Sequence, residues 1–307
     1  MTFIEELCIA GGAHRGISYI GVLRKLEELE LLDRLKLKRV IGTSIGALVS
    51  YIYLLGLDPL DFFMCVIDKD ISSFKNFNEQ MNGYLINNNK IYEWIIELIN
   101  VSQHTNENTN ENTTFIEFYE MNKIDYNISA VCIETQNQCF FNYRDTPDVK
   151  IIDAVMASIS LPLIFNSYKI GNKSYYDGGY VCNMPIYRLG PFSIGIMTIP
   201  TPISNNEGNE GIMNMFDSWI QNIETYIDII HGYFEKLHNE GRNISEFIIK
   251  VKVKSEQLNF DMSEHDKINL FMMGYNEVIA SDVVHKFKNM RYFQENVLRE
   301  MKTRNKE

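Results

Sequence analysis

The chain has 307 residues, of which 45% are apolar and 22% charged, and this balance fits a globular fold. It excludes an intrinsically disordered or collagen-like chain. Asp and Glu number 40 against 29 Lys and Arg, giving a formal net charge of -11. That charge argues against a protein held on duplex nucleic acid by phosphate contacts. The 5 cysteines form no C-x-x-C pair, which favours reduced thiols over a disulfide framework.

Two features of the sequence bear on location. Glu5 and Glu6 stand where a secretory signal would carry basic residues ahead of an apolar stretch. We therefore expect a protein that is not secreted and lies in the cytoplasm or at the periphery of a membrane. The uncharged residues 40–57 approach the length of a spanning helix. They hold two glycines and two hydroxyl residues within their first seven positions, so we expect a strand, a turn and a buried helix instead of a transmembrane segment.

Strands alternate with helices in the first part of the chain. The apolar pattern predicts a strand, a glycine-rich loop, an amphipathic helix, a second strand, a turn and a buried helix, at residues 7–10, 11–16, 17–29, 35–41, 42–46 and 47–55. A helix should follow Asp58, because Asp is a favoured N-cap and Pro59 suits the first helical position. This alternation indicates an α/β fold with a parallel sheet covered on both faces.

The remaining chain continues as one domain. We expect a helix at 90–100, hairpins at 128–143 and 168–176, a helix at 151–158, strands at 192–199 and 246–253, a long helix at 213–238, and a last helix opened by Ser263 and Asp266. Residues 102–114 contain no apolar side chain and repeat Thr-Asn-Glu-Asn, so we expect a mobile, solvated loop inserted in a single domain spanning 1–307.

The C-terminal tail, residues 285–307, is basic. It carries 7 Lys or Arg and 3 Asp or Glu, a net charge of +4, so the rest of the chain carries -15. Such a tail could hold an acidic protein at an anionic membrane surface. The alternative is a solvated terminal helix with no partner.

The segment Gly42-Thr43-Ser44-Ile45-Gly46 has the G-x-S-x-G pattern between a predicted strand and a predicted helix. This is the setting in which a tight turn exposes a serine nucleophile. The unpaired backbone N–H groups of the following helix would favour attack on an ester there. The alternative is a helix start in which Ser44 acts only as a cap and both glycines only pack.

The loop Gly11-Gly12-Ala13-His14-Arg15-Gly16 also lies between a strand and a helix, which makes it a candidate anion cradle. A dinucleotide fingerprint would require glycine where Ala13 stands. An oxyanion loop requires only backbone N–H groups, which Ala13 supplies. Arg15 falls in the first turn, where the helix dipole disfavours a cation, so a carboxylate or a ligand anion would compensate it.

Together with Asp177-Gly178-Gly179, these two motifs resemble, in order, the patatin-like phospholipases. Three further stretches resemble the same family, namely Ala157 to Pro162 before Phe165, Asn183-Met184-Pro185, and Thr114-Phe115 with Glu117-Phe118-Tyr119. The resemblance implies a three-layer α/β/α sandwich with a mainly parallel central sheet. It also implies a Ser-Asp dyad, with Ser44 as nucleophile and Asp177 as general base, and an oxyanion bound by amides of residues 11–15. Gly16, Gly42, Gly46, Gly178 and Gly179 would support these turns.

The sequence departs from the family at Ala13, where a third glycine is usual. If the loop needs a positive φ there, alanine costs about 1 to 2 kcal/mol. Asp177 is followed by two glycines, so the alternative is that it is an ordinary turn residue with no catalytic role. As a base it must lie within hydrogen-bond reach of the Ser44 hydroxyl, and partial burial should raise its proton affinity.

The sequence thus predicts a metal-independent and cofactor-independent hydrolase that cleaves fatty acyl esters of lipids through an acyl-enzyme. One alternative is a Ser-His-Asp α/β-hydrolase acting on small esters or peptides, with one of the 6 histidines as base. The candidates are His14, His104, His231, His238, His265 and His285. The other alternative is a non-catalytic module that uses the cleft to bind phosphate or protein.

Overall fold

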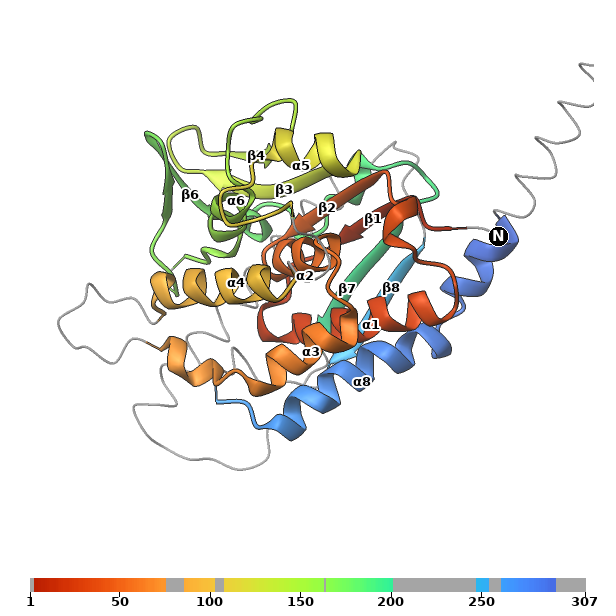
Figure 1. The fold of residues 1–307 in the computed structure, drawn as a ribbon. Coiled ribbons are helices and arrows are strands. Elements are labelled where there is room, and N and C mark those ends of the chain that lie inside the picture. The colour runs from red at the N-terminus through yellow and green to blue at the C-terminus, as the bar shows by residue number, and fades with distance from the viewer. Residues whose placement is uncertain are drawn as a thin grey trace, which may run out of the picture.

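The computed structural model describes residues 3–75, 86–102, 108–162, 164–200, 247–253 and 261–290. An eight-stranded sheet runs through its centre (Figure 1). The strands are β1 Glu6–Ile9, β2 Arg39–Thr43, β3 Asp125–Cys132, β4 Asn137–Phe141, β5 Tyr168–Ile170, β6 Lys173–Asp177, β7 Ile194–Pro200 and β8 Ile248–Val253. Their order is β5-β6-β3-β2-β1-β7-β8, and β4 pairs with β3 outside this path.

The middle of the sheet is parallel. β1 pairs in parallel with β2 and β7, β2 with β3, and β7 with β8. The hairpins β3–β4 and β5–β6 and the pair β3–β6 are antiparallel. The predicted α/β fold with a mainly parallel central sheet is therefore confirmed, and both predicted hairpins are present.

One register detail brings distant parts of the chain together. Residues 128–132 of β3 pair with β4, while 125–129 pair with β2 and 130–132 with β6. Because a strand residue has one neighbour on each edge, β2 and β6 must share the edge of β3 that β4 does not occupy. They meet there end to end. Thr43 is opposite Ser129, and Asp177 is opposite the next residue, Ala130.

The helices are α1 Ile17–Glu28, α2 Ile45–Leu54, α3 Pro59–Asp68, α4 Asn88–Ser102, α5 Phe115–Asn122, α6 Ile151–Ile159 and α8 Glu264–Ala280. α1 and α8 lie side by side along the lower part of Figure 1, with α3 beside them. α2 is buried from Gly46 to Leu54, as its apolar sequence predicts. Within the described ranges no helix combines the length and the apolar character that crossing a bilayer demands.

The two faces of the sheet differ. Side chains alternate along a strand, so Leu7 and Ile9 of β1 join the large core beneath the helices, whereas Cys8 faces the other way. Cys8 belongs to a smaller apolar cluster that includes Met184 and Leu189. The two faces therefore carry separate cores, and the segment after β6 covers part of the second.

Two element predictions need correction. The strand expected at 35–41 starts only at Arg39, because Asp33 caps a 3-10 turn over Arg34–Lys36 and Leu35 is 79% exposed. Helix α5 was not predicted at all, although Thr114 and Glu117 form a complete capping box at its start. The long helix expected at 213–238, and residues 291–307 of the basic tail, lie outside the described residues.

Candidate active site

Ser44 stands at a sharp turn between β2 and α2. Its backbone has φ 53° and ψ -128°, a conformation that is costly for a residue with a side chain. The turn is held by Ser158, whose buried hydroxyl accepts a hydrogen bond from the Ser44 N–H at 2.8 Å. That hydroxyl itself donates to the Ser129 carbonyl at 2.6 Å. The G-x-S-x-G segment thus forms a strained turn between a strand and a helix.

The two glycines of this motif allow a close approach of α2 to the sheet. A Cβ on Gly46 would lie 2.5 Å from the Ala10 carbonyl oxygen at the end of β1. A Cβ on Gly42 would lie 2.5 Å from the Cα of Ala47. Neither neighbour can move without shifting the backbone. Glycine at both positions therefore lets the first turn of α2 sit directly above the ends of β1 and β2.

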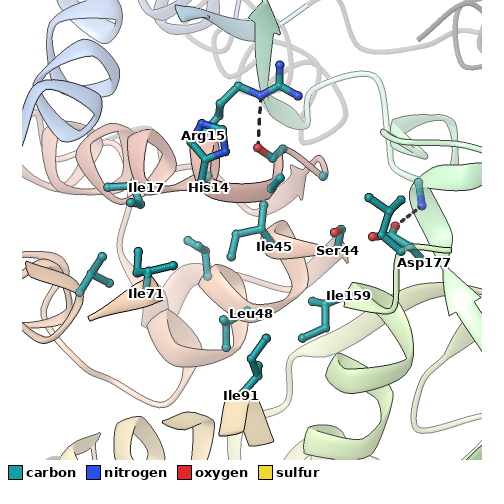
Figure 2. A pocket seen from close by; sticks show the side chains of 18 of the residues that line it. His14, Arg15, Ile17, Ser44, Ile45, Leu48, Ile71, Ile91, Ile159 and Asp177 are labelled. Atoms are coloured by element: carbon teal, nitrogen blue, oxygen red, sulfur yellow. Dashed lines mark hydrogen bonds between the residues drawn. The ribbon is translucent and has the colours of Figure 1, made fainter. Parts of the chain in front are cut away.

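Asp177 is the last residue of β6. It pairs with the same edge of β3 as β2 does, one residue beyond the end of β2. It is only 4% exposed, and the Ser44 hydroxyl lies near enough to affect the pKa of its carboxyl. Its Oδ1 also accepts the N–H of Gly179 at 2.7 Å. Figure 2 shows Ser44 and Asp177 facing each other at one end of a pocket. The structure therefore brings together the two residues that the sequence singled out.

The environment of Asp177 changes its acidity. Burial raises the pKa of its carboxyl to about 7, and the hydrogen bonds from Ser44 and Gly179 only partly oppose this. No cation is among the causes of the shift. A carboxylate with such a pKa is a far better proton acceptor near neutral pH than an ordinary Asp.

The glycine-rich loop lies on the other side of Ser44. Ala13 has φ 47°, so the positive φ on which the cost of alanine depends is present. The Gly11 N–H donates to Asn183 Oδ1 at 2.9 Å, and the Arg15 N–H donates to the Gly12 carbonyl at 3.0 Å. The amides of Gly12 and Ala13 have no hydrogen-bond partner within the described part of the chain. These two N–H groups are therefore free to bind an anion.

The remaining loop residues shape the rim. Burial, and secondarily the charge of Arg15, lowers the pKa of His14 to about 3, so its imidazole is neutral at physiological pH. The Arg15 Nε donates to the Gly12 carbonyl at 3.4 Å. Gly16 packs against Ile45, which follows Ser44. In Figure 2 the His14 ring lies away from Ser44, on the far side of Ile45.

Behind Ser44 the structure contains a cavity of about 210 Å³. Its polar end holds Ser44, Asp177 and the loop from Gly11 to Gly16. The rest of its wall is apolar and comes mainly from α2, α3, α4 and the 3-10 turn Ile71–Phe74: Leu48, Val49, Phe62, Val66, Ile71, Phe74, Ile91 and Trp94, with Ile159, Leu161 and Phe165. In the described ranges no group of three or more His, Cys, Asp or Glu side chains is arranged to hold a metal ion.

Sequence reasoning missed several residues of this site. Ser158 and Asn183 lie in stretches that resemble the family, but the pattern alone does not reveal what their side chains bind. Tyr19 looks like an ordinary core residue of an amphipathic helix, yet its hydroxyl donates to the Gly11 carbonyl at 2.9 Å. The apolar end of the cavity was missed because it is assembled from several segments that are far apart in the sequence.

Comparison with known proteins gives a consistent picture. The patatin-like phospholipase family profile matches residues 7–189. A protein of Invertebrate iridescent virus 6 named "Probable lipid hydrolase 463L" is 26% identical over 186 residues, which are 60% of this chain and 62% of that protein. Uncharacterized protein R571 of Acanthamoeba polyphaga mimivirus is 24% identical over 290 residues, which are 90% of this chain and 92% of that protein.

Solved structures share the fold. VipD from Legionella pneumophila superposes with a TM-score of 0.60 at 15% identity, covering 90% of this chain and 66% of that chain. ExoU, in the ExoU–SpcU complex from Pseudomonas aeruginosa, gives a TM-score of 0.51 at 15% identity, covering 92% of this chain and 52% of that chain. The chain thus spans less than two thirds of the iridescent virus protein and of VipD. Because the family match covers more than half of the sequence and includes all three motifs, the chain belongs to the patatin-like phospholipase family.

Proposed function

We propose that this protein is a lipid acyl hydrolase that cleaves fatty acyl esters through a Ser44–Asp177 dyad and an acyl-enzyme. The observation that carries the proposal is that the Ser44 hydroxyl faces a buried, weakly acidic Asp177 at the polar end of an otherwise apolar cavity. Family membership and the name of the iridescent virus relative support lipid as the substrate class.

In the first half-reaction Asp177 removes the hydroxyl proton of Ser44 as Oγ attacks the acyl carbonyl carbon. The carbonyl oxygen becomes an oxyanion that the N–H groups of Gly12 and Ala13 stabilise. The tetrahedral intermediate then collapses. The ester C–O bond breaks, the leaving alcohol or lysolipid takes the proton from Asp177, and the acyl group remains on Ser44.

In the second half-reaction water attacks the acyl-enzyme. Asp177 takes the proton of that water, the same N–H groups stabilise the second oxyanion, and Ser44 leaves with the proton returned to its Oγ. The products are a fatty acid and the free enzyme. The apolar wall of the cavity contributes by holding the alkyl chain out of water, at about 0.8 kcal/mol for each buried methylene.

The direct test is release of free fatty acid from a panel of phospholipids and neutral lipids in EDTA. We expect wild type to release fatty acid and Ser44→Ala to release none above background. Ser281→Ala is the matched control, because Ser281 is a half-buried serine at the end of α8 that does not line the cavity. Full activity in Ser44→Ala, or loss of wild-type activity in EDTA, would contradict the proposal.

The Ser-His-Asp alternative is separated by a histidine series. Each of the 6 histidines is changed to alanine, and kcat/KM is compared with that of Asp177→Asn. Removing the base of a triad should cost about 10⁴ in rate. The dyad predicts that no histidine variant approaches that loss and that Asp177→Asn does. A fluorophosphonate probe, which should label wild type but not Ser44→Ala, separates both hydrolases from a non-catalytic binding module.

A further inference from the structure

Asn183 lies six residues after Asp177, and the mechanism above gives it no role. Its side-chain amide forms two hydrogen bonds with one residue of the glycine-rich loop. The Gly11 N–H donates to Oδ1 at 2.9 Å, and Nδ2 donates to the Gly11 carbonyl at 3.2 Å. A side chain that pairs with both the N–H and the C=O of one residue replaces the pairing that a neighbouring strand would provide.

Gly11 needs this substitute because β1 leaves the sheet there. Ala10, one residue earlier, still donates its N–H to the Ile196 carbonyl of β7 at 2.9 Å. At Gly11 the carbonyl accepts from Asn183 and from the buried Tyr19 hydroxyl, the latter at 2.9 Å. The Gly11 N–H thus donates mainly to the Asn183 side chain, with a longer bond of 3.4 Å to the Asn183 main-chain carbonyl, and the Gly11 carbonyl accepts from two side chains. The loop therefore leaves the strand in a fixed direction.

The same amide touches the turn that carries Asp177. A Cβ on Gly179 would lie 3.0 Å from Asn183 Oδ1 and 3.0 Å from Asp177 Oδ1, so the amide and the carboxylate flank one residue. A Cβ on Gly11 would lie 3.1 Å from the Cβ of Ser44. Asn183 therefore connects the turn after Asp177 with Gly11, which lies against Ser44.

We infer that Asn183 is a positioning residue that fixes the oxyanion loop relative to Ser44 and Asp177, with Tyr19 as a second support on the Gly11 carbonyl. This inference rests on the proposed function. By pairing with Gly11, Asn183 fixes the residue that precedes the unpaired amides of Gly12 and Ala13, which the proposed mechanism uses to bind the oxyanion. Its contribution then belongs to the transition state, in which the oxyanion exists, and not to ground-state binding.

The test compares Asn183→Ala with wild type on one soluble fatty acyl ester. We expect kcat to fall about 10- to 100-fold, a part of the 10² to 10³ that loss of an oxyanion donor costs, while KM changes less than threefold. Tyr19→Phe should lose less, about 3- to 10-fold, because Asn183 still donates to the Gly11 carbonyl. Asn122→Ala is the control, since it removes a similar half-buried amide that donates to the Phe118 carbonyl at 3.1 Å, away from the cavity.

Inhibition by a trifluoromethyl ketone with a fatty alkyl chain distinguishes a positioning role from a merely structural one. A merely structural role would leave the Ki of this inhibitor unchanged. Its adduct on Ser44 places an oxyanion against the loop, so its Ki should rise by the same factor as kcat/KM falls. A normal Ki in Asn183→Ala, or kcat within twofold of wild type, would overturn the inference. If Asn183→Ala does not fold, Asn183→Asp serves, because it keeps the acceptor for the Gly11 N–H and loses the donor to the Gly11 carbonyl. We expect the same parallel change there.

Wild type and Ser44→Ala are assayed beside these variants. This comparison tests the proposed hydrolase activity separately from the positioning role of Asn183. No hydrolysis by wild type would refute the proposed function and the positioning role together. Hydrolysis that depends on Ser44 but is unaffected by Asn183→Ala would refute the positioning role alone.

Discussion

The two ends of the cavity are built on different physical principles. At the polar end single atoms matter. Ser44 and Ala13 hold positive φ angles, and the Gly11 peptide is fixed by two side chains. At the apolar end only volume and polarity matter, because Phe74, Trp94 and their neighbours contribute surface. We therefore expect changes at the polar end to abolish the reaction, and changes at the apolar end to alter which substrate reacts.

The largest effect is expected for Asp177→Asn, which keeps the shape of the base and removes its ability to accept a proton. Activity should fall about 10³- to 10⁴-fold, by analogy with removal of an acidic partner in hydrolases. The measurement is kcat/KM on a soluble fatty acyl ester. Activity within tenfold of wild type would show that another group is the base.

The same variant should be more stable than wild type, in a pH-dependent way. The folded-state pKa of Asp177, about 7, lies above its ordinary value of 3.8, so the folded protein binds the proton more tightly than the unfolded chain. Stability is therefore lost as pH rises from about 4 to about 7, by up to about 4 kcal/mol. Asp177→Asn removes this loss. Thermal unfolding should show a higher Tm than wild type at pH 8 and a nearly equal Tm at pH 4.

The pH dependence of wild-type catalysis should follow the same group. Because the dyad needs the ionised carboxylate, kcat/KM should be level above pH 7 and fall about tenfold per unit below it. The residual activity of Asp177→Asn should lack this inflection. A wild-type inflection near pH 4 would mean that Asp177 is solvated in the free enzyme.

At the apolar end we expect a shift of preference instead of a loss. Ile91 lines the cavity from α4, and tryptophan in its place would occupy room for about two methylenes of a substrate chain. At about 0.8 kcal/mol per methylene, Ile91→Trp should lower kcat/KM for a long-chain ester about tenfold relative to a short-chain one. Val101→Trp, on the same helix but 39% exposed, is the control. An unchanged chain-length profile in Ile91→Trp would place the alkyl chain elsewhere.

The smallest effect concerns Ala13. Glycine tolerates φ 47° without strain, but it also gives the unfolded chain more freedom, so Ala13→Gly should raise stability by no more than about 1 kcal/mol. Activity should stay within about threefold of wild type. Ala13→Val, which cannot easily adopt a positive φ, should lose both stability and rate. Equal behaviour of the two variants in chemical denaturation would contradict the role assigned to the backbone here.

The sequence predicted the parts of this molecule that depend on local chemistry. Strand and helix periodicity located most described elements, and the two glycine-rich turns were recognisable because few residues suit such backbones. The start of β2 was misplaced because Leu35 is apolar yet exposed, so periodicity alone extended the strand too far. Helix α5 was missed because its capping box at Thr114 directly follows a polar stretch.

The support around the two predicted residues could not be predicted. Ser158 acts through a hydroxyl that bridges the Ser44 N–H and the Ser129 carbonyl, and Asn183 through an amide that pairs with Gly11. Neither hydrogen bond leaves a periodic pattern in the sequence. Ser158 is 114 positions from Ser44, and Asn183 is 172 positions from Gly11. Only the tertiary arrangement defines them.

The shared edge of β3 has a consequence for how such a protein can diverge. Thr43 and Asp177 sit opposite adjacent residues, Ser129 and Ala130, so main-chain pairing sets the separation of hydroxyl and carboxylate. The connection between them also carries β3, Ser158 and most of the cavity wall, but its loops take no part in setting that separation. Insertions or deletions in those loops should be tolerated as long as three short strands keep their alignment, whereas slippage of β6 by a single position would turn the carboxylate to the opposite face and inactivate the site.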